Sequence, residues 1–487
     1  MNVSMNTWLE NRWDALRTNF WFLPGMMAAA AVVACLLLLH VDSVIGESFP
    51  LLQAGSIEGV RTLLGVLIGA MVTAVSIVFS TTVVVLTLAA SQLGPRLLRT
   101  YVRDRSNQVL FGVFMATLFY SLTAMFVVGR MSPTGNLPNL TILGAFGLTC
   151  ASLIVLIYFI HHVARAIQAP NVILSVSAEL RRLIARTYPL EPPEGSEEPV
   201  TENIDEKLPE HAVSIAAETS GYMQAIDTDG LMKLTQEQDI VVRTLHRPGH
   251  FVMECDTLAE VYSAEEVEQA VVERIRAMIQ WRPERKLDLD THAGIQSKFI
   301  MGHRRTATQD VEFVLMELVE IALRALSPGI NDPFTAMTCV DRLTEALRRL
   351  APRYIPSRYR YDDGGTLRLI VDRTSFRGFC NAAFHQIRQH AASNTAVLIR
   401  MLEDLRLLLA VTRTEEQKAV VWKHACMIRR AAERLPEPED RKDVEERFND
   451  LARDAGHPDA HPEERLRDEG RPSPPQPQEN ENTTPVR

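Results

Sequence analysis

An unbroken uncharged stretch of the chain, residues 62–95, reads TLLGVLIGAMVTAVSIVFSTTVVVLTLAASQLGP. As a helix rising about 1.5 Å per residue it would reach about 50 Å, which exceeds the roughly 30 Å hydrocarbon core of a bilayer. Outward from this stretch, three further uncharged runs are long enough to cross a membrane. We therefore predict an α-helical integral membrane protein whose transmembrane domain, residues 21–170, holds four helices at about 21–41, 62–91, 108–129 and 140–160.

The second predicted span carries its small and hydroxyl side chains on one stripe. At about 100° per residue these side chains gather within a sector of about 80°. Two interpretations are open: small residues let helices pack closely while hydroxyls bond between them, or the stripe faces water in a pore. The stripe, which we call the α-stripe, consists of Thr62, Gly65, Gly69, Thr73, Ser76, Ser80, Thr87 and Ser91.

Arginines near the spans predict the orientation of the chain. Arg96 and Arg99 follow the second span, and Arg181 and Arg182 follow the fourth, whereas the other loops are poor in basic residues. Because short loops rich in Lys and Arg stay on the cytoplasmic side, we predict a multi-pass protein of the bacterial inner (plasma) membrane with cytoplasmic N- and C-termini.

The first 20 residues are predicted to form an interfacial segment. Trp8 and Trp13, with Trp21 just beyond them, are typical of an aromatic anchor at the membrane surface. A short amphipathic helix packed on the protein would show the same pattern, so both interpretations stay open.

The polar remainder predicts a mixed α+β cytoplasmic domain. Strand-forming residues around the turn Arg247-Pro248-Gly249 indicate short strands over 221–262, and the capping box Ser263/Glu266 indicates a flanking helix. High charge and many prolines indicate unfolded segments on both sides of the folded part. The predicted parts are an acidic linker (189–210), a small β-rich module with its flanking helix (211–285), a helical domain (286–435) and a disordered acidic tail (436–487).

A helical hairpin is predicted within the helical domain. One helix runs from Asp310 to about Leu326, and Asp332 caps a second helix that begins at Pro333. The intervening loop is either a structural hinge, with Gly329 supplying a positive φ, or a polar site at a subunit or ligand interface, with Arg304 and Arg305 as nearby basic candidates. The candidate loop residues are Ser327, Pro328, Gly329, Asn331, Asp332 and Pro333.

Three motifs give the chain a family resemblance. They are SQLGPR at 91–96, IALRALSPGINDPFTA at 321–336, and SGYMQAIDTDGL at 220–231 leading to RPGHFV at 247–252. With the four apolar spans, they resemble the bacterial predicted-membrane-protein family called domain of unknown function twenty-two fifty-four. The resemblance covers roughly residues 10–430 and implies an inner-membrane location, with no catalytic residue to carry over. Glu254-Cys255 stands where the resemblance leads us to expect a small residue or Gly in a β-turn.

Composition and motifs exclude several classes of function. The net charge of −9 argues against a nucleic-acid partner, which requires a basic face. The six cysteines show no metal-ligand spacing, and phosphate-binding, nucleophile-elbow and zinc-protease motifs are missing. We therefore expect no enzyme activity, no catalytic residue, no metal and no cofactor.

Two functional hypotheses follow. The first is a homo-oligomeric, channel-like conduit in the lipid bilayer, lined by the second span. The alternative is a membrane-tethered regulatory or interaction module whose cytoplasmic domain binds an unknown partner. The spans contain no Asp, Glu, Lys or Arg, which disfavours a proton-driven pump.

Overall fold

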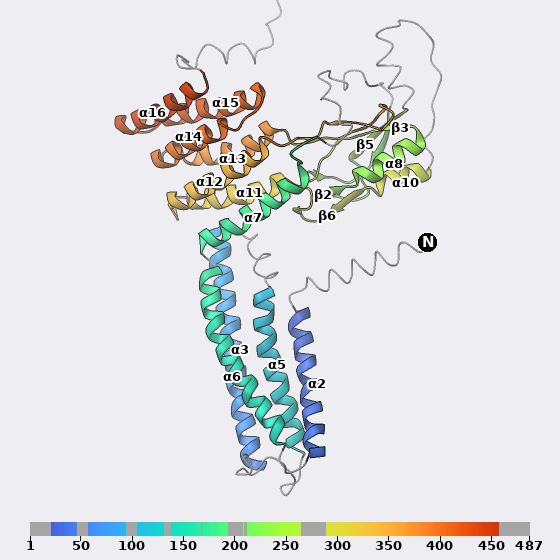
Figure 1. Cartoon of the computed structure of the whole chain (residues 1–487), viewed down its shortest axis with the longest axis vertical. Helices are drawn as coiled ribbons and strands as arrows, with labels where there is room; N and C mark the ends of the chain where they lie inside the picture. Colours follow the sequence, from blue (N-terminus) through green and yellow to red (C-terminus); the bar gives the residue numbers. More distant parts are fainter. Residues whose placement is uncertain are drawn as a thin grey trace, which may run out of the picture.

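The computed structural model describes residues 21–45, 57–93, 105–130, 138–166, 168–192, 208, 212–263 and 289–456. Four apolar helices stand side by side below two folded domains (Figure 1). Three predictions lie wholly or mainly outside the described residues: the interfacial segment 1–20, most of the acidic linker, and the flanking helix that would follow Ser263. The last residues of the predicted disordered tail, 457–487, also lie outside them.

The four apolar helices confirm the predicted number of candidate membrane spans. They are α2 (Phe22–Ile45), α3 (Ile57–Leu93), α5 (Arg105–Val128) and α6 (Asn139–Ala166). α5 is the central helix, since it packs against each of the other three. By length and composition, each of the four helices can cross a bilayer.

Two polar side chains at the end of the bundle far from the domains cap neighbouring helices. Asp42, near the end of α2, accepts hydrogen bonds from the backbone N–H of Leu140 (3.0 Å) and Thr141 (2.9 Å), at the start of α6. Arg61, in the first turns of α3, donates to the carbonyl oxygens of Val128 and Gly129 at the end of α5. The two side chains satisfy helix-end groups that have no partner within their own helix.

Seven helices form one hydrophobic core and make up the helical domain (Figure 1). The predicted hairpin is confirmed: Asp310 and Asp332 are the N-caps of its two helices, and Pro333 is the first residue of the second. The helices are α7 (Ala169–Thr187), α11 (Val311–Ala325), α12 (Pro333–Leu350), α13 (Phe376–His390), α14 (Thr395–Leu409), α15 (Glu415–Ala432) and α16 (Pro438–Asp454).

Two of these helices correct the sequence-based picture. The acidic tail was predicted to be disordered from residue 436, but α16 occupies 438–454 and buries Val444, Phe448 and Leu451 on one face. Their spacing of four and three residues outweighs the acidic average, because it presents a continuous apolar stripe to the core. α7, which follows α6 directly, packs on α11 and α12. The four-helix bundle therefore connects, through α6 and α7, straight into the core of the helical domain.

The β-module consists of two sheets that are linked to the helical domain. Sheet A has the strand order β1-β5-β3-β8-β7, and sheet B has the order β4-β2-β6. The strands are β1 (Val213–Ala216), β2 (Gly221–Ile226), β3 (Ile240–Thr244), β4 (Phe251–Val252), β5 (Thr257–Ser263), β6 (Phe299–Gly302), β7 (Tyr359–Tyr361) and β8 (Leu367–Ile370), with two helices, α8 (Thr228–Gln238) and α10 (Leu289–Gln296).

The β-module differs from the prediction in two respects. The run 221–262 was predicted as strands throughout, but α8 interrupts it: Asp227 caps its start, and Asp239 ends it in a left-handed conformation. Strands β6, β7 and β8 also come from beyond residue 285, where the module was predicted to end. Short strands that pair over long sequence separations leave no local signal of their partner, so the boundary at 285/286 does not match the sheets.

Candidate functional site

The α-stripe of α3 is exposed, on the side of the helix opposite its buried face. Thr62, Gly65, Gly69, Thr73, Ser76, Ser80 and Thr87 are all exposed; Ser91 belongs to α3, but its side chain is outside the described part of the chain. The buried residues of α3 include Val60, Leu64, Met71, Val78 and Val85. At about 100° per residue, the centre of the α-stripe lies roughly 180° from the centre of that buried face.

The hydroxyl groups of the α-stripe bond to their own helix. Thr73 Oγ1 donates to the carbonyl of Gly69 (2.9 Å), and Ser76 Oγ donates to that of Val72 (2.8 Å). Thr62 and Thr87 make the same type of bond four residues back. A Cβ built on Gly65 or Gly69 would meet nothing within 4 Å. The α-stripe is therefore not used for packing within one chain.

Polar residues do hold helices together elsewhere in the bundle. Thr117 of α5 and Ser152 of α6 are buried, with their hydroxyl oxygens 2.7 Å apart. Tyr120 Oη donates to the carbonyl of Thr141 (3.1 Å), next to Gly144, where a Cβ would collide with the Tyr120 hydroxyl. Within one chain, close packing through small and hydroxyl residues is therefore found at this α5–α6 seam, because such residues let the two helices approach closely.

A groove of about 340 Å³ opens beside the α-stripe. It lies between α3, α5 and the first residue before α2, so two hydroxyl-bearing residues of the α-stripe meet an apolar wall. The lining residues are Trp21, Val75, Ser76, Phe79, Ser80, Phe111 and Met115.

The hairpin loop between α11 and α12 is tightly bonded within itself. Asp332 N–H donates to the carbonyl of Ala325 (2.7 Å), and the Asp332 carboxylate accepts bonds from the N–H and the hydroxyl of Thr335. The residue with positive φ is Asn331 (49°), whereas Gly329 was predicted for that role. Asparagine tolerates this region because its side chain is short and polar.

The predicted basic neighbours of this loop lie elsewhere. Arg305 pairs with Asp310 (2.7 Å), the N-cap of α11, while the loop follows the C-terminal end of the same helix. A helix of 15 residues is roughly 22 Å long. The structure therefore does not bring Arg305 together with Asn331 and Asp332. The loop instead exposes Ile330 and Phe334, which sequence reasoning passed over.

The RPGHFV motif docks the β-module on the helical domain. Gly249 has φ +98°, and a Cβ there would collide with the Asp310 carboxylate, so only glycine fits. Arg247 pairs with Glu312 on α11 (2.9 Å). Burial raises the pKa of Asp310 despite its pairing with Arg305. At the turn where a small residue was expected, Cys255 adopts a left-handed conformation with φ +70°.

Burial shifts the pKa of two titratable side chains in the helical domain. Burial, together with the charge of Asp341, raises the pKa of Asp404 on α14 to about 7. Burial and the nearby His385 lower the pKa of His424 on α15 to about 3. The His385 and His424 rings lie 5.1 Å apart. Within the described residues, no group of three or more His, Cys, Asp or Glu side chains is placed to hold a metal ion.

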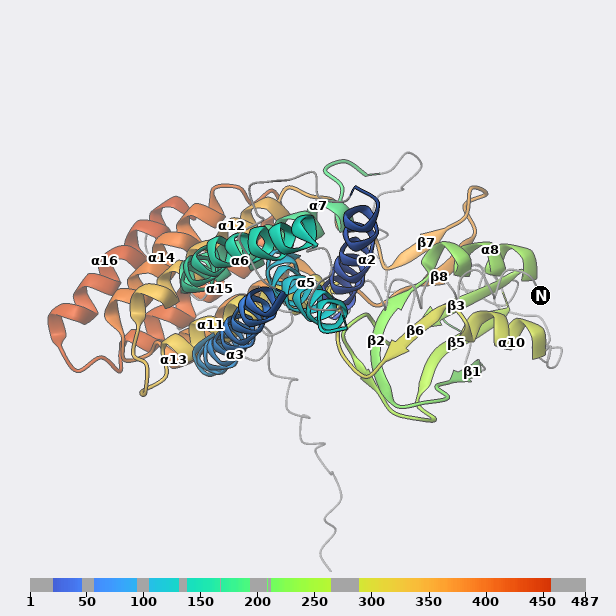
Figure 2. The same cartoon turned by 90° about the horizontal axis from the view of Figure 1, so that it is seen from below.

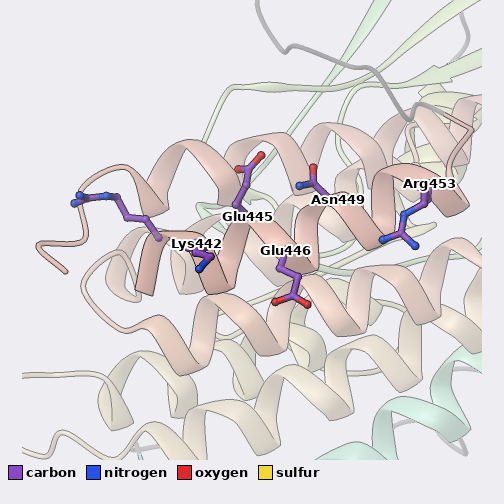
Figure 3. A pocket seen from close by; sticks show the side chains of 6 residues that line it. Lys442, Glu445, Glu446, Asn449 and Arg453 are labelled. Atoms are coloured by element: carbon purple, nitrogen blue, oxygen red, sulfur yellow. The ribbon is translucent and has the colours of Figure 1, made fainter. Parts of the chain in front are cut away.

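A larger hollow of about 620 Å³ lies on the outer surface of α16 (Figure 3). Its side chains come from one helix and carry both charges. Glu445 pairs with Arg429 (2.7 Å), and Arg453 pairs with Asp450 (2.6 Å). Because these charges are neutralised by neighbours, the hollow has the character of an ordinary solvated helix surface.

Comparison with known proteins identifies the family but no activity. Uncharacterized proteins of Mycobacterium bovis and Mycobacterium tuberculosis are each 29% identical to the chain over 423 residues, covering 86% of this chain and 77% of theirs. No solved structure matches the chain. The sequence profile described as predicted membrane protein (DUF2254) matches residues 17–406. The resemblance seen in the three sequence motifs is thereby confirmed, and the chain belongs to this family of predicted membrane proteins.

Proposed function

We propose that the chain assembles into a homo-oligomer in the membrane and that the α-stripe of α3 lines a conduit between the copies. The observation that carries this proposal is the orientation of the α-stripe. Its described residues are exposed, and Ser76 and Ser80 line an open groove beside α5, although the same types of residue are buried at the α5–α6 seam. A row of glycines and hydroxyls gains little from contact with acyl chains, whereas it suits close helix approach or a polar lumen.

The contact between α3 and the helical domain supports a vestibule on the same axis. α3 is 37 residues long, continues past the predicted span and packs against α11. If the α3 helices of several copies surround the axis of the oligomer, the helical domains of those copies surround the opening of the conduit. The loop between α3 and α5, with Arg96 and Arg99, connects helix ends on the domain side. By the positive-inside rule we place this side, and both termini, in the cytoplasm of a bacterial inner membrane.

The test of the conduit is conductance of the purified protein in planar bilayers. The wild-type chain conducts, and Ser80→Phe blocks the current because an aromatic ring fills the lumen at that level. Ile77→Phe is the matched control, since Ile77 is an exposed apolar residue off the α-stripe. Equal currents from the two variants, or a silent wild type with verified incorporation, would overturn the conduit.

Cross-linking tests the oligomer separately. α3 contains no native cysteine, so once Cys150→Ser and Cys255→Asn remove the two exposed thiols, oxidation of Thr73→Cys should link two copies through a disulfide between stripe positions. Ile77→Cys should stay monomeric under the same oxidation, because it faces lipid. Exclusively monomeric Thr73→Cys would contradict the assembly, whatever the current measurements give.

A second candidate is the membrane-tethered interaction module, which exposed residues in the hairpin loop favour. Phe334 is 76% exposed and Ile330 is 42% exposed, at a loop that is held by several internal backbone hydrogen bonds. Exposed apolar side chains on a rigid loop suit a protein partner. Phe334→Asp should abolish co-purification of that partner from native membranes while leaving conductance unchanged. Unchanged co-purification would exclude this candidate.

A further inference from the structure

Sheet B carries large apolar side chains on its outer face. Phe251 is 53% exposed, Met253 62% and Ile300 51%, and the Tyr222 ring lies edge-on to that of Phe251 with centroids 5.1 Å apart. The opposite face of the sheet is buried, because Met223, Val252 and Phe299 belong to the core of the β-module. We call Tyr222, Phe251, Met253 and Ile300 the outer face of sheet B. Contiguous exposed apolar side chains of this size mark a binding surface more often than a solvated one.

Sheet B lies on the side of the β-module that is nearer the four apolar helices, and its outer face is turned away from the core that it shares with sheet A. In Figure 1, β2 and β6 are the lowest elements of the module, directly above α2, and Figure 2, seen from below, again shows them beside α2. The start of α2 faces the domains, because Asp42 near its other end caps the far end of the bundle. Trp21, which is 57% exposed, therefore stands on the same side as sheet B. Tryptophan at this position is typical of the membrane interface.

The β6 side of the outer face of sheet B carries basic side chains, whereas Glu254 and Asp256 are exposed next to Met253, just after β4. His303 and Arg304 follow β6 directly and are exposed. Gln224 Nε2 donates to the carbonyl of Arg304 (2.8 Å), which fixes the backbone of that residue next to the sheet. Among the ion pairs of the described residues, neither His303 nor Arg304 has an acidic partner. Apolar and aromatic side chains beside basic residues are the pattern of a surface that lies in the headgroup region.

We propose that the outer face of sheet B rests on the bilayer surface, with its apolar side chains among lipid headgroups and Arg304 and His303 contacting lipid phosphates. A lipid surface is favoured over a soluble partner because sheet B lies on the side of the β-module that is nearer the four apolar helices. The β-module then contacts the bilayer at a second point besides the spans themselves. The proposal depends on membrane embedding alone and not on the conduit.

The test measures solvent access at Met253 in the full-length protein. Met253→Cys is spin-labelled after Cys150→Ser and Cys255→Asn remove the two exposed native thiols; asparagine tolerates the left-handed backbone at 255. The protein is placed in nanodiscs of phosphatidylethanolamine and phosphatidylglycerol, and collision with a water-soluble nickel chelate is recorded. Phe334→Cys, on the helical domain, is the matched exposed control.

The expected result is a several-fold lower collision rate at position 253 than at position 334. The collision rate at position 253 should rise when neutral lipid replaces phosphatidylglycerol or when Arg304→Glu is introduced. Equal collision rates at the two positions would overturn the proposal. Protection that disappears on deletion of residues 2–20 would overturn it in favour of the N-terminal segment as the occupant. Protection with dipolar broadening between labels would overturn it in favour of a second copy. Size-exclusion chromatography of each variant before spin-labelling verifies that the variant is folded.

Discussion

The α5–α6 seam and the α-stripe use the same kinds of residue in opposite ways. At the seam, Thr117 meets Ser152 across the helix interface, and Gly144 makes room for Tyr120. On the α-stripe, Thr73 and Ser76 bond back to their own helix, and Gly65 and Gly69 face open space. Residue type alone therefore does not separate packing from exposure. The difference is the presence of a packed neighbouring helix. A single chain supplies such a helix at the seam and does not supply one over the α-stripe.

The largest expected difference between the two regions is at their glycines. Gly144→Val should lower the free energy of unfolding by about 3 kcal/mol, because the added side chain collides with Tyr120 in a packed interface. Gly65→Val should leave the stability of the single chain nearly unchanged, since nothing lies within 4 Å. Unfolding in mixed micelles of increasing SDS content measures both. Equal losses for the two variants would show that the α-stripe is packed after all.

The contrast between partnered and unpartnered polar groups extends to the helical domain. Asp341 pairs with Arg400 through two bonds of 2.6 and 3.0 Å, whereas the buried Asp404 faces Asp341 and Thr344 of α12, with Arg400 and Glu403 on its own helix. Its folded-state pKa of about 7 lies above the ordinary 3.8. The folded state therefore binds a proton more tightly than the unfolded state, so stability falls as pH rises from the unfolded to the folded pKa.

Asp404→Asn should consequently stabilise the protein above neutral pH by about 2 kcal/mol, and by almost nothing near pH 4. The gain appears because the amide carries no charge to desolvate in the core. Asp341→Asn is the control with the opposite sign, since it leaves Arg400 without its bidentate partner. Thermal unfolding of the full chain in detergent at about pH 5 and about pH 8 checks the pH dependence. A gain for Asp404→Asn that is independent of pH would contradict the raised pKa.

The smallest expected effect on the free energy of unfolding comes from removing a hydroxyl group from the α5–α6 seam or from the α-stripe. Thr117→Val should cost about 0.6 kcal/mol, because it leaves Ser152 without its partner across the interface. Thr73→Val should cost less than that in the single chain, since only a bond to its own helix is lost. The same SDS unfolding experiment applies. A larger loss at Thr73 than at Thr117 would indicate that the α-stripe already has a partner in the measured state.

The sequence predicted the elements whose signals are local. Apolar runs located the four helices, and Asp310, Asp332 and Pro333 located the hairpin, because caps and hydrophobic length act within a few residues. The prediction failed where long-range contacts decide. β7 and β8 join a sheet begun more than a hundred residues earlier, and α16 is folded because Phe448 and its neighbours fit a core that composition does not reveal.

The candidate site was predictable only in part. The helical periodicity of α3 predicted which residues share the α-stripe, and the structure shows that this side of the helix is exposed. The hairpin loop was recognised, but the residue with positive φ is Asn331 and not Gly329. Asn331 directly precedes the N-cap Asp332, whose N–H bonds back to the carbonyl of Ala325, so the chain turns at this residue. The exposed aromatic and methionine side chains of sheet B left no signal, since alternation in short strands does not reveal which face remains uncovered.

The caps formed by Asp42 and Arg61 have a mechanical consequence. They tie α2 to α6 and α3 to α5 at the end of the bundle away from the domains, while at the other end α3 touches α11 and α6 leads into α7. A tilt of the helical domain would therefore act on the near ends of α3 and α6, while the caps hold the far ends of the helices together. Loosening those caps, rather than altering the domain, would uncouple the two halves of the molecule.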